Sequence, residues 1–360
     1  MESKRVAVLG GGHGAHAMAA DFALRGHSVA MYEMPQFADR MRVVFETKTI
    51  HAVGVVEGAA RLDLVTSDLD EAIAGADYIC LVAPAFSHEG YAEALKGRVK
   101  ADQRLVVIPG AFAALQIAKI FGDAPKPLLA DVNNLPYDAR LSAPGKVSIF
   151  GLNPVNIAFL PARGGDEVIE EFRADLFPFE KVYKDVLECG LSIVNPTMHS
   201  GACLLNISNI ERPDVNFFIY EHGWTPSTSK LNIALDNERK AIGEAFGYQL
   251  RPIEDFSGMP DNYTWQQLYA AGHGAISLTP ISGPNTIWDR YLTEDTPFGL
   301  VPWASIADAL GLDTPMIDAV INIYNVIHET DWRERGMTAT DLGLAGMTVE
   351  EILEYVRTGA

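Results

Sequence analysis

Short apolar runs alternate with helix-like stretches through the first half of the chain. The runs at residues 5–9 and 28–32 flank one such stretch, and further runs follow at 78–82 and 104–108. Apolar runs of this length are typical of strands buried on both faces, and strands that alternate with helices form parallel sheets. Shorter strands are expected over residues 128–159. The pattern therefore predicts an α/β fold with a doubly wound, Rossmann-type sheet.

The second half of the chain has a different pattern of hydrophobic and polar positions. Beyond about Val186 the pattern is mainly helical. Breaks fall at residues 223–226, 283–284 and 314–315. We therefore expect an N-terminal α/β domain over residues 1–185 and a mainly α-helical C-terminal domain over residues 186–360. The acidic, amphipathic segment at residues 348–357 is expected to form a helix that docks on the second domain.

A glycine-rich turn directly follows the first apolar run. Residues 10–15 read Gly-Gly-Gly-His-Gly-Ala. Gly10 would allow the tight turn, Gly12 would let the backbone approach a pyrophosphate, and Ala15 is small enough for close helix packing. The pyrophosphate would then lie at the positive end of the following helix. The turn residues assigned to a dinucleotide cofactor are Gly10, Gly12, His13, Gly14 and Ala15.

An acid at the end of the second apolar run refines this expectation. Glu33 has the spacing at which an acid accepts hydrogen bonds from both ribose hydroxyls. The same carboxylate would repel a 2′-phosphate, so NAD (NADH) is expected in preference to NADP. Pro84 follows the run at 78–82, at the sheet edge where ligands bind, and joins the expected cofactor site. The alternative is a plain strand–turn–helix connection that only needs flexible residues.

Composition narrows the class of protein. The 360 residues are 48% hydrophobic and 21% charged, which is typical of a soluble globular protein with two domains. The net charge of −19 argues against nucleic acid or an anionic membrane as a partner. No apolar run approaches the roughly 18 residues of a membrane span.

The cysteines and the N-terminal residues indicate the cellular compartment in which we expect the protein. Cys80, Cys189 and Cys203 are odd in number and well separated, so we expect reduced core residues in a cytoplasmic protein. The chain enters its first expected strand at Arg5, and a signal peptide is not expected. The histidines and cysteines lack metal-ligand spacing, so no metal is predicted.

The second half contains candidates for acid–base chemistry. Hydride transfer to a carbonyl or imine needs a nearby proton donor, and histidine is the usual one. His199 follows Asn195 in the first turns of an expected helix, just beyond the domain boundary, and could face a cleft between the domains. The alternative is a histidine that is satisfied by its own surroundings.

Residues 283–302 form the other dense segment. Arg290 could clamp a carboxylate, and Asp295 could hold the far nitrogen of a histidine and fix its tautomer. Thr225 could cap a helix and contact the substrate. The alternative is a surface loop whose charged residues form exposed ion pairs, which contribute little.

Taken in order, these motifs resemble the octopine/nopaline-type opine dehydrogenase family. The resemblance rests on residues 10–17, 195–199, 220–227, 236–239, 283–302 and 314–315. It implies condensation of an amino acid's amine with an α-keto acid, often pyruvate, using a nicotinamide cofactor. It also implies that His199 and Asp295 form the acid–base pair, that Arg290 binds the keto acid, and that a homodimer forms through the helical domain.

The sequence also departs from this family. Relatives often have proline directly after the histidine, where this chain has Ser200. The tract 254–279, which could cover the amino-acid pocket, matches poorly, so the amino acid is left open.

Two other readings remain open at this point. A dehydrogenase of hydroxy acids or polyol phosphates shares the glycine turn, but such enzymes usually act through a helical lysine, and none lies between Asn195 and Glu211. A non-catalytic NAD-binding sensor would have no need of His199, Arg290 and Asp295 together.

Overall fold

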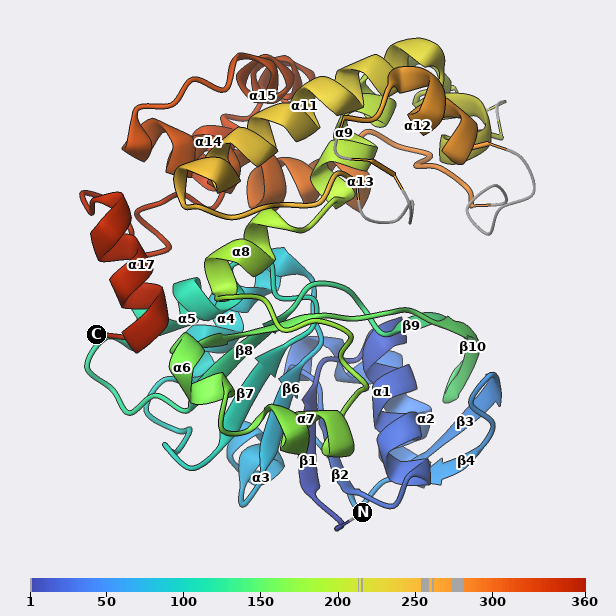
Figure 1. Cartoon of the computed structure of the whole chain (residues 1–360). Coiled ribbons are helices and arrows are strands. Elements are labelled where there is room, and N and C mark those ends of the chain that lie inside the picture. Colours follow the sequence, from blue (N-terminus) through green and yellow to red (C-terminus); the bar gives the residue numbers. More distant parts are fainter. Residues whose placement is uncertain (1, 213, 215, 254–258, 261, 274–280) are drawn as a thin grey trace. The chain divides into compact units, whose positions relative to one another are not determined.

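The computed structural model describes residues 2–212, 214, 216–253, 259–260, 262–273 and 281–360 (Figure 1). The chain divides into two compact units. The first comprises Met1–Gly190 and Glu354–Ala360, and the second comprises Leu191–Leu353. The first unit contains the sheets, and the second is built from helices, so the expected fold class is confirmed.

The first unit is built on a seven-stranded sheet in the order β11-β8-β7-β6-β1-β2-β5. Its strands are β1 Arg5–Leu9, β2 Ser28–Tyr32, β5 Leu64–Thr66, β6 Tyr78–Leu81, β7 Arg104–Val107, β8 Leu128–Val132 and β11 Ile157–Leu160. All neighbours are parallel except β11, which runs antiparallel to β8. Residues 6–9 of β1 are fully buried, as expected for a central strand covered on both faces. Because β2 and β6 flank β1 on opposite sides, the turn after β1 lies at a topological switch point.

Helices connect these strands. They are α1 His13–Leu24, η1 Pro35–Met41, α2 Arg42–Thr47, α3 Leu69–Ile73, η2 Ala85–Ser87, α4 His88–Leu95, α5 Ala113–Phe121, α6 Ala162–Gly165, α7 Ile169–Asp175 and α8 Val186–Leu191. The last of these, α8, leads into the second unit.

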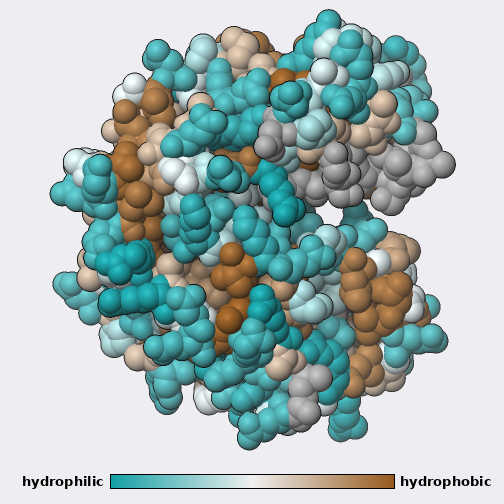
Figure 2. Space-filling model, viewed as in Figure 1, coloured by the Kyte–Doolittle hydropathy of each residue, from teal (hydrophilic) through white to brown (hydrophobic). Residues whose placement is uncertain are grey.

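A small second sheet packs against α1 in the order β4-β3-β10-β9. Its strands are β3 Thr49–Gly54, β4 Gly58–Arg61, β9 Tyr137–Ala143 and β10 Lys146–Leu152. Figure 2 shows apolar side chains gathered on the surface where Figure 1 draws β9 and β10. On and beside this sheet Val55 is 57% exposed, and Phe150 and Leu152 are each 62% exposed. The sequence pattern predicted strands over residues 128–159, which include β9 and β10. It predicted neither β3 and β4 nor a separate sheet.

The second unit is a helical bundle around α11. Its elements are α9 Asn195–Leu204, α10 Ile207–Ile210, η3 Ile219–Gly223, α11 Pro226–Ala245, α12 Trp265–Ala271, α13 Arg290–Thr293, η4 Thr296–Leu300, α14 Val301–Leu310, α15 Pro315–Ile327 and α16 Trp332–Arg335. Helix α9 is unbroken although it contains Ser200. The helix α11 packs against α9, α12, α14 and α15. None of the helices in the described part of the chain has the length and apolar character needed to cross a membrane.

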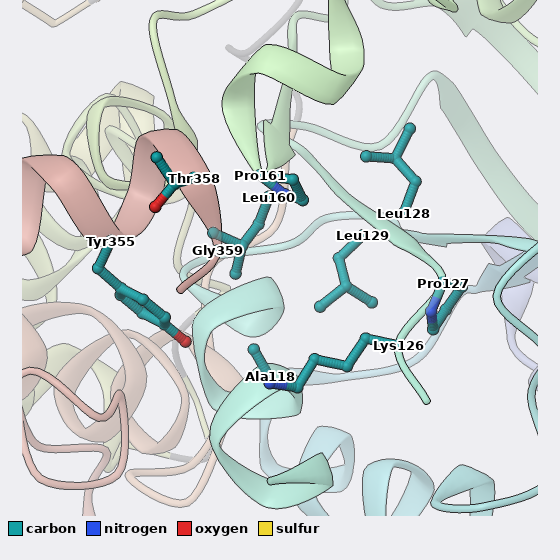
Figure 3. A pocket seen from close by; sticks show the side chains of 10 residues that line it. All are labelled: Ala118, Lys126, Pro127, Leu128, Leu129, Leu160, Pro161, Tyr355, Thr358 and Gly359. Carbon is teal, nitrogen blue, oxygen red and sulfur yellow. The ribbon is translucent and has the colours of Figure 1, made fainter. Parts of the chain in front are cut away.

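The C-terminal helix corrects part of one expectation. Helix α17 spans Val349–Thr358, and its residues up to Leu353 group with the second unit, as expected, whereas residues 354–360 group with the first unit. Tyr355, Thr358 and Gly359 line a cavity of about 300 Å³ whose other wall includes Leu128 and Pro161 (Figure 3). The first unit offers an apolar surface here, so burial of the helix's apolar side stabilises docking on that unit.

Candidate active site

In the turn after β1, Gly10 and Gly12 are glycines for two different physical reasons. Gly10 has φ +125°, and a Cβ there would lie 2.3 Å from the carbonyl oxygen of Val82. The fold itself therefore requires Gly10. A Cβ on Gly12 would meet no atom of the described residues within 4 Å, and the φ of Gly12 is an ordinary −79°. The protein's own packing does not explain Gly12, whereas close approach of a ligand would.

The open space at Gly12 lies at the start of α1. Gly12 is the N-cap of this 12-residue helix, and no side chain in the described part of the chain caps it. Uncapped N–H groups at a helix N-terminus bind anions such as pyrophosphate. Gly14 is buried under Leu135, whose side chain would lie 2.7 Å from an added Cβ, and Ala15 is fully buried. These two small residues set the packing below the turn.

The imidazole of His13 contacts the small sheet. The backbone N–H of Leu141 donates a hydrogen bond of 2.9 Å to Nδ1 of His13. This contact joins the start of α1 to β9. A role of His13 toward a cofactor stays a prediction.

The carboxylate of Glu33 lies against the glycine turn. A Cβ on Gly11 would lie 2.3 Å from Oε2 of Glu33, and the N–H of Met34 donates to Oε1 at 2.7 Å. Burial raises the pKa of Glu33, and hydrogen bonds from the N–H groups of Met34 and Gly11 oppose that effect. Glu33 therefore stands beside the turn, as expected of an acid that binds ribose hydroxyls.

The loop after β6 brings Pro84 to the same edge of the sheet. Pro84 is exposed and precedes η2. The buried His88 supports this loop, since its Nε2 lies 3.0 Å from the carbonyl oxygen of Ala83. Burial lowers the pKa of His88 to about 4, so its imidazole is neutral at neutral pH. His88 is therefore a structural residue at the start of α4.

In the second unit, the fold brings His199 and Asp295 together. Nδ1 of His199, on α9, lies 2.7 Å from Oδ2 of Asp295, directly before η4. The two side chains are 10% and 15% exposed. A carboxylate can only accept, so Nδ1–H donates and Nε2 is the atom left for proton exchange.

Two tyrosines that the sequence did not single out complete the surroundings of this imidazole. The hydroxyl of Tyr220 lies 3.2 Å from Nε2 of His199. The ring of Tyr291 meets the imidazole edge-on, with centroids 4.5 Å apart and an interplanar angle of 87°. Both tyrosines lie in motifs that carry the family resemblance, and an aromatic hydroxyl in such a motif was the available signal.

Arg290 and Thr225 have other partners in the structure. Arg290 begins α13 with a side chain that is 70% exposed, and its Nε lies 3.2 Å from Oε2 of Glu294. A carboxylate ligand could compete with Glu294 for this guanidinium. Thr225 caps α11 by accepting a hydrogen bond of 3.2 Å from the N–H of Thr228. Capping accounts for Thr225, and its contact with a substrate stays a prediction.

Two further motifs are structural. Asp236 and Arg239 form an ion pair with 0% exposure of both side chains. Arg239 also donates to the carbonyl oxygens of Leu191 and Arg251. The carboxylate of Glu238 accepts from the N–H groups of Met316 and Ile317 at the start of α15. The 236–239 and 314–315 motifs therefore hold the bundle together.

Three other expectations concern metal binding, the state of the cysteines and the tract 254–279. No group of three potential ligands that could hold a metal occurs among the residues described in this structure. Cys80, Cys189 and Cys203 are buried thiols that take part in no disulfide among the described residues. Residues 254–258, 261 and 274–280 lie outside the described residues, so nearly half of the tract 254–279, which is expected to cover an amino-acid pocket, has no structural account.

Comparison with protein families gives two matches. The family described as NAD/NADP octopine/nopaline dehydrogenase, alpha-helical domain, matches residues 182–328. The family described as NAD-dependent glycerol-3-phosphate dehydrogenase N-terminus matches residues 5–115.

Individual proteins match over nearly the whole chain. The chain is 32% identical to an opine dehydrogenase of Arthrobacter sp. (strain 1C), with 99% of each chain covered. It is 27% identical to octopine dehydrogenase of Mizuhopecten yessoensis, with 88% of each covered. A structure of octopine dehydrogenase in complex with NADH and agmatine superposes with a TM-score of 0.74 at 24% identity, covering 99% of this chain and 98% of that one. At this identity the structural likeness shows the fold.

Proposed function

We propose, on the premise that this chain belongs to the octopine/nopaline-type opine dehydrogenase family, that it catalyses reductive condensation of an amino acid with an α-keto acid. It is an NAD(P)-dependent oxidoreductase acting on a CH–NH bond. The keto acid is pyruvate and the product is an N-(carboxyalkyl)amino acid. The reverse oxidation uses the same residues.

The pairing of His199 with Asp295 is the observation that carries this proposal. The substrate carboxylate binds the guanidinium of Arg290, and the carbonyl oxygen lies on the Nε2 side of protonated His199. The neutral amine of the amino acid attacks the carbonyl carbon. The oxygen then leaves as water, with one proton that originates from His199 and one from the attacking amine. Asp295 holds the imidazole in the tautomer that presents Nε2. In the reverse direction His199 accepts the proton.

The cofactor is NADH, in preference to NADPH. When bound, it supplies the hydride that reduces the imine. The open space at Gly12 and the uncapped start of α1 suit its pyrophosphate, and Glu33 suits its ribose hydroxyls. The buried carboxylate of Glu33 would repel the 2′-phosphate of NADPH.

The test is NADH oxidation with pyruvate and each of the twenty amino acids. We expect turnover that needs both substrates and that falls by roughly 10²–10⁴-fold in His199→Ala, which removes the proton donor. His51→Ala, at an exposed position on β3, is the matched control and should keep wild-type turnover. Turnover with the keto acid alone would instead indicate a hydroxy-acid dehydrogenase. Tight NADH binding without turnover on a wider keto-acid panel would indicate a sensor.

Compartment and assembly belong to the same proposal. The three buried thiols suit the cytoplasm, where thiols stay reduced. A homodimer is expected from the family resemblance. Sedimentation velocity of the purified enzyme tests it, and a monomer at assay concentration would contradict it.

A further inference from the structure

The hydroxyl of Tyr220 occupies the proton-exchanging side of His199. Because Asp295 accepts from Nδ1, Nε2 is the nitrogen left for acid–base chemistry, and Oη of Tyr220 lies 3.2 Å from it. A phenol hydroxyl is neutral near pH 7 and can donate and accept at once. It therefore accepts from Nε2–H of the imidazolium, and it can pass a proton on through its own O–H.

The position of Tyr220 is fixed by its surroundings. Tyr220 is 5% exposed and belongs to η3, a single π-type turn, which is a geometry frequent at functional sites. Its ring packs beside the fully buried Trp224, with centroids 5.8 Å apart. The end of this turn is held by Asn206 and Thr228, whose side chains both donate to the carbonyl oxygen of Gly223. The contact to His199 therefore arises from a well-supported element.

The imidazole of His199 is also held in position by its neighbours. In the described part of the chain, the titratable side chains in contact with it are Asp295, Tyr220 and Tyr291. Asp295 takes one ring nitrogen and Tyr291 covers the ring edge-on. With both contacts in place, the imidazole presents Nε2 to the hydroxyl of Tyr220.

We propose that Tyr220 is a proton-relay residue that acts between His199 and the substrate oxygen. In the condensation direction, the proton on Nε2 moves to Oη of Tyr220 while the hydroxyl proton of Tyr220 moves to the departing substrate oxygen. One N–H and one O–H bond break, two O–H bonds form, and the imidazolium becomes neutral while Tyr220 is regenerated. This inference rests on the proposed function of His199 and adds a residue to it.

The variant that tests the relay is Tyr220→Phe, which removes only the hydroxyl. We expect kcat to fall at least ~10-fold with little change in KM, within the range that general acid–base catalysis supplies. The solvent deuterium isotope effect on kcat should also decrease, because one fewer proton is in flight. Tyr355→Phe deletes the same group in the first unit and should leave both quantities at wild-type values.

A second measurement does not depend on turnover. The hydrogen bonding of His199 can be followed by NMR in protein with ¹⁵N-labelled histidine. The ¹⁵N chemical shift of Nε2 depends on its hydrogen-bond partner, so loss of the Tyr220 hydroxyl should change that chemical shift. A role in packing alone would not change it.

The outcomes separate this inference from the proposed function. Wild-type kcat and isotope effect in Tyr220→Phe, with His199→Ala inactive, would overturn the relay and leave the function intact. A loss of kcat accompanied by a lower unfolding temperature and an unchanged Nε2 chemical shift would assign Tyr220 to structure and also overturn the relay. Absence of two-substrate turnover in the wild type would count against the proposed function, and the Nε2 chemical shift would then decide whether Tyr220 is hydrogen-bonded to His199.

Discussion

Nδ1 of His199 and Oδ2 of Asp295 lie 2.7 Å apart although 96 positions separate the residues in sequence. Both side chains are largely shielded from water, where a charge-assisted hydrogen bond is stronger than at the surface. The hydrogen bond therefore orients the imidazole, and the negative charge of the Asp295 carboxylate strengthens it.

The first prediction removes that charge. Asp295→Asn should lower the condensation rate by roughly 10²–10⁴-fold, because the neutral amide no longer offers a charged acceptor to Nδ1–H of His199 and does not enforce the tautomer. Steady-state kinetics at one fixed pH measure this effect. Asp313→Asn, at an exposed position, is the control, and equal rates in the two variants would contradict the assignment.

The second prediction concerns cofactor choice. Glu33→Gln should improve kcat/KM for NADPH relative to NADH by about tenfold, equivalent to ~1.4 kcal/mol, because the repulsion of a 2′-phosphate disappears. Burial raises the pKa of Glu33, so its negative charge is lost on acidification at a higher pH than for an exposed glutamate. Wild-type discrimination against NADPH should therefore weaken as pH falls, while that of the variant should not. A pH-independent wild-type ratio would argue against Glu33 as the discriminating group.

The third prediction compares two glycines of one turn. Gly12→Ala should keep the free energy of unfolding within about 1 kcal/mol of wild type, because the new Cβ meets no described atom of the chain. Its affinity for NADH should nevertheless fall at least ~10-fold, since the methyl group occupies the space left for the pyrophosphate. Gly10→Ala should instead destabilise the fold by about 1–3 kcal/mol, owing to its positive φ and the Val82 carbonyl. Urea unfolding and NADH fluorescence titration distinguish the two, and wild-type affinity in Gly12→Ala would exclude this ligand position.

The fourth prediction tests the buried ion pair of the bundle. Arg239→Met should lower the free energy of unfolding by about 3–5 kcal/mol, because it leaves the carboxylate of Asp236 in a fully buried site without its main partner. The matched control is Arg357→Met, which breaks an exposed pair with Glu354 at the same sequence spacing. That change should cost less than about 1 kcal/mol. Similar losses in the two variants would show that burial does not set the contribution of these pairs.

Local pattern determined much of the first unit. The apolar runs predicted β1, β2, β6 and β7, because a strand buried on both faces must be apolar at every position. The glycine turn and Glu33 were also readable, since each is set by local backbone geometry and by spacing along the chain. For the second unit, the change of hydrophobic period indicated helices, and His199 and Asp295 were singled out as residue types suited to proton transfer.

Tertiary structure decided the rest. Pairing between β3 and β10 joins segments almost a hundred residues apart, and the pattern of neither segment specifies the other. The docking of residues 354–360 on the first unit depends on an apolar surface made by other segments, so an amphipathic helix alone does not identify its partner. Likewise, the sequence around Tyr220 does not show that η3 brings its hydroxyl to Nε2 of His199. Sequence therefore determined which local structures and chemical groups this protein has, whereas packing between distant segments decided which groups meet, because that depends on the folding of the whole unit.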